Sequence, residues 1–405
     1  MSKLEELIQE LCPDGVETFP LEECCNILDK KRKPVTKNSR EKGEYPYYGA
    51  NGVQDYVSDY IFNGKFVLVG EDGSVITKSG TPVVTWAEGK IWVNNHAHVI
   101  EEKSGTMLRY LYFYIQTIDV TSLIHGNIPK LTGRDFRSLK IALPPLEIQR
   151  EIVSILDNFT NLTAELTAEL TARKTQYGYY RDKLLEVETD IHKYTLGEIA
   201  TVTKLAGFEF TNYVTYSERG NIIALRALNV INGKLDLSDV KYIDKSDFSK
   251  LERSKLHIGD MLFTYVGTVG QVAIVDEEDK YYLAPNVALI RFDKKILLPQ
   301  YMKYYFQTTQ FWDKQIRRLL QSSSMQNIPM EKIRKFEIIV PPFDVQNRIV
   351  NVLDNFEKIC SDLNIGLPAE IEARQKQYEY YRDKLLTFAE TGNTILNGTE
   401  RNGTE

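Results

Sequence analysis

The sequence contains a basic loop followed by aromatic and amide residues, a combination typical of proteins that read nucleic acids. Asp29-Lys-Lys-Arg-Lys-Pro34 leads through Lys37 and Arg40 to Tyr45-Pro-Tyr-Tyr-Gly-Ala-Asn-Gly52. Lys and Arg side chains pair with phosphates, whereas Tyr and Asn can contact the edges of bases. A solvated loop without a ligand is the alternative interpretation. The residues that we expect to contact DNA here are Lys30, Lys31, Arg32, Lys33, Lys37, Arg40, Tyr47, Tyr48 and Asn51.

Two further polar loops occupy similar places in the two halves of the chain. They are His125-Gly-Asn-Ile-Pro-Lys130 and Arg317-Arg-Leu-Leu-Gln-Ser-Ser-Ser-Met-Gln-Asn327. Arg and Gln suit paired hydrogen bonds to guanine and adenine. Gly267-Thr-Val-Gly270 resembles Asp72-Gly-Ser74 as a turn that can approach a ligand closely. The DNA-binding residues expected from these segments, with one further lysine added, are Asn127, Lys130, Lys204, Thr268, Arg317, Arg318, Gln321, Ser322, Gln326 and Asn327.

The motifs of the common catalytic and metal sites are missing from the sequence. There is no phosphate-binding GxxxxGK[ST] loop, no HExxH and no glycine-rich start of an adenosylmethionine-binding fold. Val340-Pro-Pro-Phe343 resembles a base-methyltransferase motif, but its first side chain is apolar and cannot accept a hydrogen bond from an amino group. His96 and His98 favour a structural or base-contacting role over a metal site. We therefore predict no catalytic residue, no metal and no cofactor of the chain's own.

The chain is an internal repeat, and this repeat indicates which elements position the polar loops. Residues 143–159 recur as 340–356, and Tyr179-Tyr-Arg-Asp-Lys-Leu-Leu185 recurs as Tyr380-Tyr-Arg-Asp-Lys-Leu-Leu386. Fainter matches lie upstream. They pair residues 110–116 with 301–307, residues 127–129 with 327–329, and Asn95 with Asn286.

Each closely repeated segment has the periodicity of a long helix. In the first, the apolar spacing of 3 and 4 residues is that of a coiled-coil seam. The simplest arrangement packs the two helices against each other, although two separate core helices remain the alternative. Gly366 and Pro368 predict a kink in the second helix. The first predicted helix contains a tandem repeat of the unit Thr163-Ala-Glu-Leu166. The seam residues of this helix are Ile148, Ile152, Ile155, Phe159, Leu162 and Leu166.

The segments between the helices combine short β-rich runs with a tyrosine-rich helix, which predicts an α+β fold. We expect two similar domains, each a twisted β-sheet plus helices. Two long helices packed as an antiparallel coiled coil would separate the domains with pseudo-twofold symmetry. The expected boundaries are 1–142 and 189–339 for the domains, 143–188 and 340–388 for the helices, and 389–405 for a disordered tail.

Composition narrows the class of protein. The chain has 405 residues, a formal net charge of −6 and 4 cysteines without a CxxC pair. No apolar run reaches the length of a membrane span, and a reducing cytoplasm fits the cysteines. Acidic residues outnumber basic ones in both helical segments, whereas residues 189–339 have a small basic excess. Weak, salt-dependent DNA binding is expected of the isolated chain.

The two-copy plan resembles the specificity subunit of type I restriction–modification enzymes. The motifs that carry this resemblance are the Pro-Pro joint with its following Gln, Ile-Val and Leu-Asp residues, and the Tyr-Tyr-Arg-Asp-Lys-Leu-Leu segment, in both halves. The resemblance implies that each domain reads one half of a bipartite, asymmetric site in double-stranded DNA. It also implies two methyltransferase subunits and added restriction–translocase subunits, to which adenosylmethionine, ATP and Mg²⁺ would belong.

Two other classes of function remain open. A coiled-coil scaffold with two protein-binding domains would not need basic, amide-rich loops at matching positions. A self-sufficient methyltransferase or nuclease is disfavoured by the missing motifs.

Overall fold

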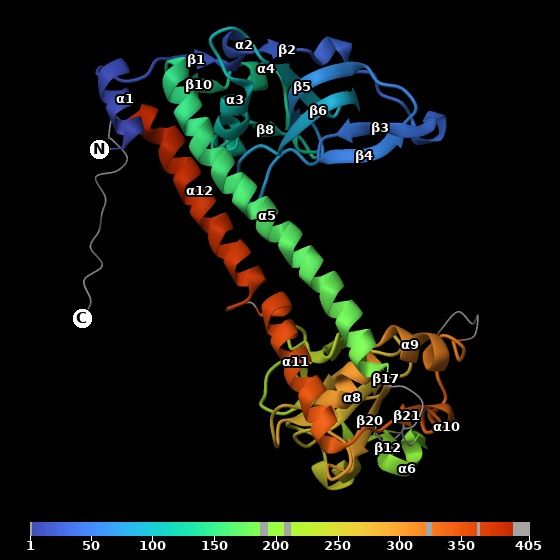
Figure 1. The fold of residues 1–405 in the computed structure, drawn as a ribbon. Coiled ribbons are helices and arrows are strands. Elements are labelled where there is room, and N and C mark those ends of the chain that lie inside the picture. The colour runs from blue at the N-terminus through green and yellow to red at the C-terminus, as the bar shows by residue number, and fades with distance from the viewer. Residues whose placement is uncertain (1, 187–192, 206–211, 321–325, 363–364, 392–405) are drawn as a thin grey trace. The chain divides into compact units, whose positions relative to one another are not determined.

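The structure is a computed structural model, and it describes residues 2–186, 193–205, 212–320, 326–362 and 365–391. The chain divides into two compact units (Figure 1). The first comprises residues 1–167 together with 370–405, and the second comprises residues 168–369. Each unit therefore contains one variable domain and parts of both repeated helical segments. None of the described helices is both long and apolar enough to cross a bilayer.

The first unit is built on a six-stranded sheet. Its strand order is β2-β7-β5-β6-β3-β4, antiparallel except for the β3–β6 pair. The tyrosine-rich helix α3 (Leu108–Ile115) buries most of its residues in the core. The strands are β2 (Asn26–Ile27), β3 (Lys42–Gly49), β4 (Gly52–Val57), β5 (Phe62–Gly70), β6 (Val84–Val93) and β7 (Ala97–Glu101).

Smaller elements complete the first unit. Strand β1 pairs with β10, and the short hairpin β8–β9 carries one of the polar loops. The capping box of α1, in which Ser2 and Glu5 satisfy each other's backbone amides, fixes the start of this helix. The bounds are α1 (Lys3–Leu11), β1 (Thr18–Pro20), α2 (Leu21–Cys24), β8 (Ile124–His125), β9 (Lys130–Leu131), α4 (Gly133–Arg137) and β10 (Lys140–Ala142).

The second unit has a four-stranded sheet of order β12-β20-β17-β18 and a three-stranded sheet of order β16-β13-β19. Its tyrosine-rich helix α8 (Pro299–Phe306) is almost wholly buried, like α3. Its strands are β11 (Lys193–Thr195), β12 (Ala200–Lys204), β13 (Ile223–Leu225), β14 (Val230–Ile231), β15 (Lys234–Leu235), β16 (Lys241–Tyr242), β17 (Met261–Thr264), β18 (Val272–Ile274), β19 (Tyr281–Leu283), β20 (Val287–Phe292) and β21 (Glu337–Ile339). The short helices are α6 (Leu196–Ile199), α9 (Thr309–Phe311), the π-helical η7 (Trp312–Ile316) and α10 (Met330–Ile333).

A buried glutamine at the start of each long helix holds the tyrosine-rich helix in place. Gln149 is 1% exposed; its Oε1 accepts from Met107 N at 2.8 Å, and its Nε2 donates to the carbonyls of Gly105 and Pro144. The bond to the Pro144 carbonyl is buried and the other two are partly buried, so the glutamine satisfies backbone groups that water reaches poorly. Gln346 makes the same three bonds in the second unit, each at 2.9 Å, to Leu298, Ile296 and Pro341.

The long helices pair in opposite directions. Helix α5 (Leu146–Leu185) runs without interruption, whereas the second repeated segment forms α11 (Phe343–Ser361) and α12 (Leu367–Thr391). In the first unit Phe159 stacks on Tyr381, and in the second unit Tyr180 packs against Phe356. The early part of α5 thus lies beside α12 and its late part beside α11 (Figure 1). This arrangement confirms the antiparallel pairing predicted from the repeat.

The second helical segment is interrupted beside Gly366, where the backbone leaves no room for a side chain. A Cβ atom at Gly366 would lie 2.6 Å from the Lys358 carbonyl oxygen and 2.7 Å from that of Asp362. The seam predicted along α5 is also less continuous than expected. Ile148 and Ile152 are fully buried, but Leu162 is 46% exposed. At mid-helix the partner helix alone does not cover this side chain.

Candidate nucleic-acid interface

Three loops of the first unit converge at one end of its sheet. The turn after β5 receives and gives backbone hydrogen bonds on both sides. Glu71 N donates to His96 O at 2.8 Å, Leu131 N donates to Glu71 O at 2.9 Å, and Gly73 N donates to Pro129 O at 3.0 Å. The Asp72-Gly-Ser74 turn, the turn at His96 and the 125–131 loop are thereby fixed next to one another.

The second unit contains the same three-loop arrangement. Tyr265 N donates to Asn286 O at 3.2 Å, Ile328 N donates to Tyr265 O at 2.9 Å, and Gly267 N donates to Gln326 O at 2.9 Å. Gly270, with a φ of +86°, lets this turn pack directly on Trp312 of η7. A Cβ atom there would lie 2.7 Å from the indole ring. The two units therefore present equivalent loop clusters.

These hydrogen bonds correct two of the faint sequence matches. Ala97 pairs with Gly70 as Val287 pairs with Thr264, so the residue equivalent to Asn286 is His96 and not Asn95. The loop match is wrong by three residues, since Pro129 takes the place of Gln326 rather than that of Pro329. Short identical tripeptides in loops carry little register information, whereas strand pairing fixes which residues are equivalent.

Two residues expected to contact DNA are instead held inside the first unit. The Arg32 guanidinium lies 2.6 Å from a Glu71 carboxylate oxygen, donates to Ala97 O at 2.7 Å, and is only 12% exposed. Tyr47 is 1% exposed and its hydroxyl exchanges hydrogen bonds with the Val35 backbone. These side chains brace the basic loop from within, so we correct their assignment to a structural role.

Two more residues of the basic loop have internal partners. Tyr48 is 9% exposed and belongs to the core under the sheet. Arg40 stacks over the Tyr47 ring at 4.0 Å and pairs with Asp55 at 3.2 Å. Their assignment to DNA contact is likewise revised, because the structure commits both side chains to packing.

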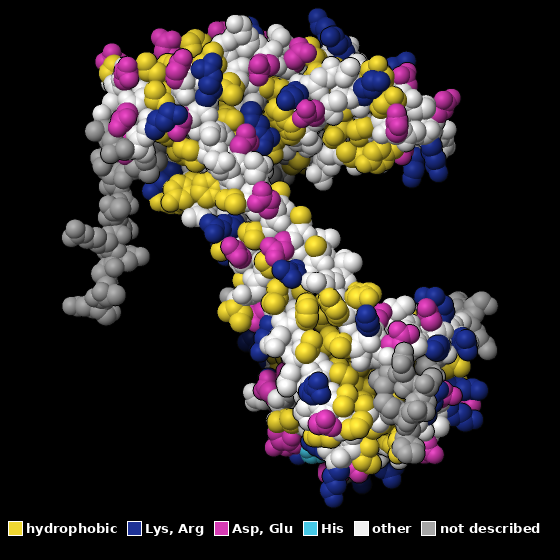
Figure 2. Space-filling model, in the orientation of Figure 1, with side chains coloured by type: hydrophobic (Ala, Val, Ile, Leu, Met, Phe, Trp, Pro, Cys, Tyr) yellow, Lys and Arg dark blue, Asp and Glu magenta, His cyan; other side chains and the backbone are white. Residues whose placement is uncertain are grey.

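The remaining predicted residues that the structure describes are at or near the surface. Lys130 is half-exposed and pairs with Glu71 at 3.4 Å, next to the Asp72 turn. Arg317 pairs with Asp313 at the end of η7. Figure 2 shows Lys and Arg side chains gathered on the second unit near α9. Gln321 and Ser322 lie outside the described residues; the exposed set is Lys30, Lys31, Lys33, Lys37, Asn51, Asn127, Lys204, Thr268, Arg317, Arg318, Gln326 and Asn327.

The structure brings five of these exposed residues to the loop clusters, namely Asn51, Asn127, Thr268, Gln326 and Asn327. Asn51 lies at the tip of the β3–β4 hairpin, whose Tyr48 carbonyl accepts from Asn94 N beside the His96 turn. Thr268 lies in the turn that pairs with Gln326. Lys37 follows the basic loop in a separate turn, and Lys204 ends β12. Within the described part of the chain, neither lysine contacts a loop cluster.

A buried network of charges supports the first cluster from below. His98 is stacked on Phe136 at 4.0 Å between ring centres, and its Nδ1 lies 2.7 Å from Asp29 Oδ2. Burial by itself raises the pKa of Asp29, but the His98 hydrogen bond and charge, the Val99 amide and Arg32 together hold that pKa below its ordinary value. Sequence reasoning missed this network because its members are distant in the chain.

This network includes the one metal-like cluster found among the described residues. Single ligand atoms of Asp29, Glu71 and His98 lie within 4.8 Å of one another. Arg32 and Lys130 form ion pairs with Glu71, and His98 Nδ1 lies 2.7 Å from an Asp29 carboxylate oxygen. Arginine and lysine side chains lie beside both carboxylates, so the geometry is that of an ion-pair network.

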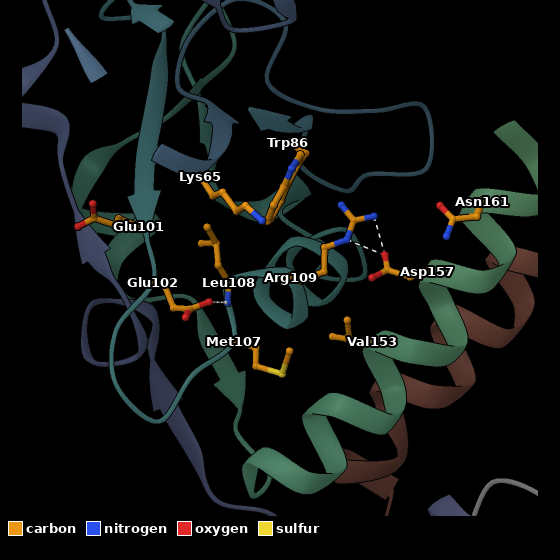
Figure 3. Close-up of a pocket in the computed structure, with 10 residues that line it drawn as sticks. All are labelled: Lys65, Trp86, Glu101, Glu102, Met107, Leu108, Arg109, Val153, Asp157 and Asn161. Carbon is orange, nitrogen blue, oxygen red and sulfur yellow. Dashed lines mark hydrogen bonds and ion pairs between the residues drawn. The ribbon is translucent and has the colours of Figure 1, made fainter. Parts of the chain in front are cut away.

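A separate open pocket of about 720 Å³ lies in the first unit between the sheet, α3 and α5 (Figure 3). Arg109 lies over the Trp86 ring at 4.9 Å and pairs with Asp157 at 2.7 Å. Glu102 accepts a hydrogen bond from Leu108 N at the start of α3. These polar side chains thus serve the packing of α3, and the pocket lies away from the loop cluster.

The fold and the paired loop clusters define a two-copy DNA specificity protein, and comparison with known families agrees. The sequence model of the type I restriction modification DNA specificity domain matches residues 13–173 and 188–373. The chain belongs to this family, and the two matched segments correspond to the two copies of the internal repeat.

Individual relatives are also described as type I restriction enzyme specificity subunits. A putative type I restriction enzyme specificity subunit of Haemophilus influenzae is 36% identical over 397 residues, which cover 95% of this chain and 98% of the relative. The EcoR124I/EcoR124II specificity subunit of Escherichia coli is 34% identical over 302 residues, covering 71% of this chain and 72% of that subunit.

Solved structures share the fold. The S subunit of a type I system from M. genitalium aligns with a TM-score of 0.53 at 13% identity, covering 92% of this chain and 97% of that one. A chain from a study of complex assembly in the type I system aligns with a TM-score of 0.56 at 15% identity, covering 93% and 98%. The predicted family and fold class are therefore confirmed.

Proposed function

We propose that this specificity subunit reads a bipartite, asymmetric DNA site, with one loop cluster for each half-site. The observation that supports this most directly is that both units hold the same three loops in the same backbone arrangement but with different side chains. His96 and Pro129 in the first cluster correspond to Asn286 and Gln326 in the second. Equivalent frameworks with unlike side chains suit two unlike half-sites.

We further propose that the chain contributes no catalytic group. The support is the absence from the sequence of the motifs for methyl transfer, nucleotide hydrolysis and phosphodiester cleavage. Adenosylmethionine, ATP and Mg²⁺ are then bound by partner subunits. The purified chain should show none of these three activities, and methyl transfer by the chain alone would contradict the proposal.

The repeated helices are proposed to dock two methyltransferase subunits, with restriction–translocase subunits joining the assembly. Tyr179 and Tyr380 occupy the same position of the repeated motif and are 59% and 53% exposed. A lysine one turn later lies over each ring, Lys183 at 5.7 Å and Lys384 at 4.4 Å. Two copies of one exposed aromatic and cationic pattern suit two copies of one partner.

A binding experiment distinguishes the proposed DNA-reading function from the alternative, a scaffold whose domains bind proteins. Double-stranded DNA of random sequence is mixed with the chain alone and with the chain assembled with a methyltransferase subunit. The assembly should select DNA molecules that share two short sequences at a fixed spacing. Recovery of unselected DNA, together with retained assembly, would favour the scaffold.

A further inference from the structure

We propose that His96 and Asn286 are equivalent base-reading residues, one in each half-site reader, and that Asp72 positions the His96 ring. This inference rests on the proposed function and names side chains through which it acts. Neither residue belongs to the basic or amide-rich loops from which DNA contacts were expected. Strand pairing and not sequence similarity shows that they are equivalent.

Both residues lie next to the central turn of their loop clusters. The backbone carbonyl of His96 accepts from Glu71 N, and that of Asn286 accepts from Tyr265 N. In each unit this hydrogen bond joins the residue to the same turn that binds the third loop. A side chain projecting from this point therefore lies beside the turn that holds the three loops of its cluster together.

The His96 side chain is held in one orientation. Its backbone N donates to Asn94 Oδ1 at 2.8 Å, and Asn94 itself is 3% exposed. Its ring Nδ1 contacts the Asp72 carboxylate, while the side chain stays 47% exposed. Among the described residues none is recorded as a partner of its Nε2. A fixed ring with one nitrogen at the surface is pre-organised to contact a ligand.

The charges around His96 suit an approach by DNA. The Asp72 carboxylate contacts the His96 ring directly. The neighbouring Glu71 carboxylate is already paired with Arg32 and Lys130. The ammonium of Lys130 is on a half-exposed side chain next to the same turn, where it can meet a phosphate. Repulsion between the acidic pair and the DNA backbone is thus partly offset within the cluster.

Asn286 presents different chemistry from the same point. It has a φ of +71°, in the left-handed region that asparagine tolerates better than most residues, and it is exposed. No side-chain hydrogen bond of Asn286 is recorded among the described residues. An amide both donates and accepts, and it suits paired contact with adenine, whereas Nε2 of an imidazole whose Nδ1–H faces Asp72 makes a single contact. The two readers should therefore prefer different bases.

The test uses the chain assembled with its methyltransferase subunits and methylation-aware sequencing of a random DNA library. His96→Ala should relax base preference, about tenfold or more, at one position of one half-site and leave the other half-site unchanged. Asn286→Ala should do the same in the other half-site only. Asp72→Asn should weaken preference at the His96 position, which a purely structural loss would not confine to one base.

The outcomes distinguish this inference from the function on which it rests. A wild-type assembly without sequence preference would refute the proposed function. A wild-type assembly that reads two half-sites, with unchanged preferences in His96→Ala and Asn286→Ala, would refute only the present inference. The exchange His96→Asn provides a second variant that keeps a polar side chain; a changed base preference at that one position supports the proposal, and uniformly weakened methylation contradicts it.

Discussion

The loop clusters of the two units share a backbone framework but rest on different interiors. Below the first cluster lie Glu71 and the buried His98, within a network of ion pairs. At the equivalent positions the second unit has Tyr265 and Ala288, which belong to or border an apolar core. The backbone hydrogen bonds of the turns are the same in both. The framework therefore does not depend on one kind of interior, and recognition residues can vary while it is kept.

The largest expected effect comes from exchanging a whole reader. Replacing residues 1–142 with the corresponding domain of another family member should change one half of the recognised site and leave the other half unchanged. The physical reason is that each unit has its own core and its own loop cluster. Sequencing of methylated sites measures the result. A change in both halves would show that the two clusters are not independent readers.

The next effect concerns the spacing between half-sites. Between Phe159 and Arg173 the first helix is four residues shorter than the second segment between Phe356 and Arg374. Adding one Thr-Ala-Glu-Leu unit after Leu166 lengthens α5 by about 6 Å and nearly preserves its apolar face, since four residues are close to one turn. We expect both half-sites to be kept and the unread spacer to grow by about one or two base pairs of roughly 3.4 Å each.

The same variant also tests an alternative explanation of that repeat. The threonine hydroxyls at 163 and 167 bond back to carbonyls one turn earlier, which any solvent-exposed helix can accommodate. Methylation by the insertion variant at sites with the original spacer would mean that the repeat is only tolerant helix. The length of the helix would then not set the distance between half-sites.

A smaller effect, expected to be alike in the two units, tests the shared framework. Gln149→Leu and Gln346→Leu each leave one backbone N–H and two carbonyls without their partner. Each change should lower the free energy of unfolding by about 2–4 kcal/mol, as chemical denaturation would measure. The exposed Gln375→Leu serves as the control and should have little effect. A large loss in only one unit would break the proposed equivalence.

The smallest expected effect is on the pH dependence of folding stability, and it concerns the first unit only. The pKa of Asp29 is lower in the folded chain than the ordinary value of about 3.9. Its ionised form therefore stabilises the fold above that ordinary pKa, and this contribution is lost as the pH falls through the lowered folded value. The stability difference between wild type and Asp29→Asn should shrink as the pH falls below about 4. A difference that grows on acidification would contradict this assignment.

The sequence predicted the repeat, the long helices and their pairing, because periodic apolar residues and a close internal match are local signals. It did not predict which polar residues of the basic loop are exposed. Arg32 meets Glu71 across 39 residues of chain, and Tyr47 is buried by the sheet that it helps to form. The equivalence of His96 and Asn286 was missed for a similar reason, since only strand pairing reveals it.

The antiparallel helix pairing has a consequence for how the protein is made on the ribosome. Leu385 and Leu386, close to the end of the described chain, lie in the same core as Leu4 and Ile8 near its start. The first unit therefore cannot complete its core until almost the whole polypeptide has been synthesised, although its sheet is translated first. The second unit, formed from residues 168–369, has its own segments available earlier. Translation should thus yield a finished second reader before a finished first one, and premature termination before residue 370 would leave the first reader with an open apolar face.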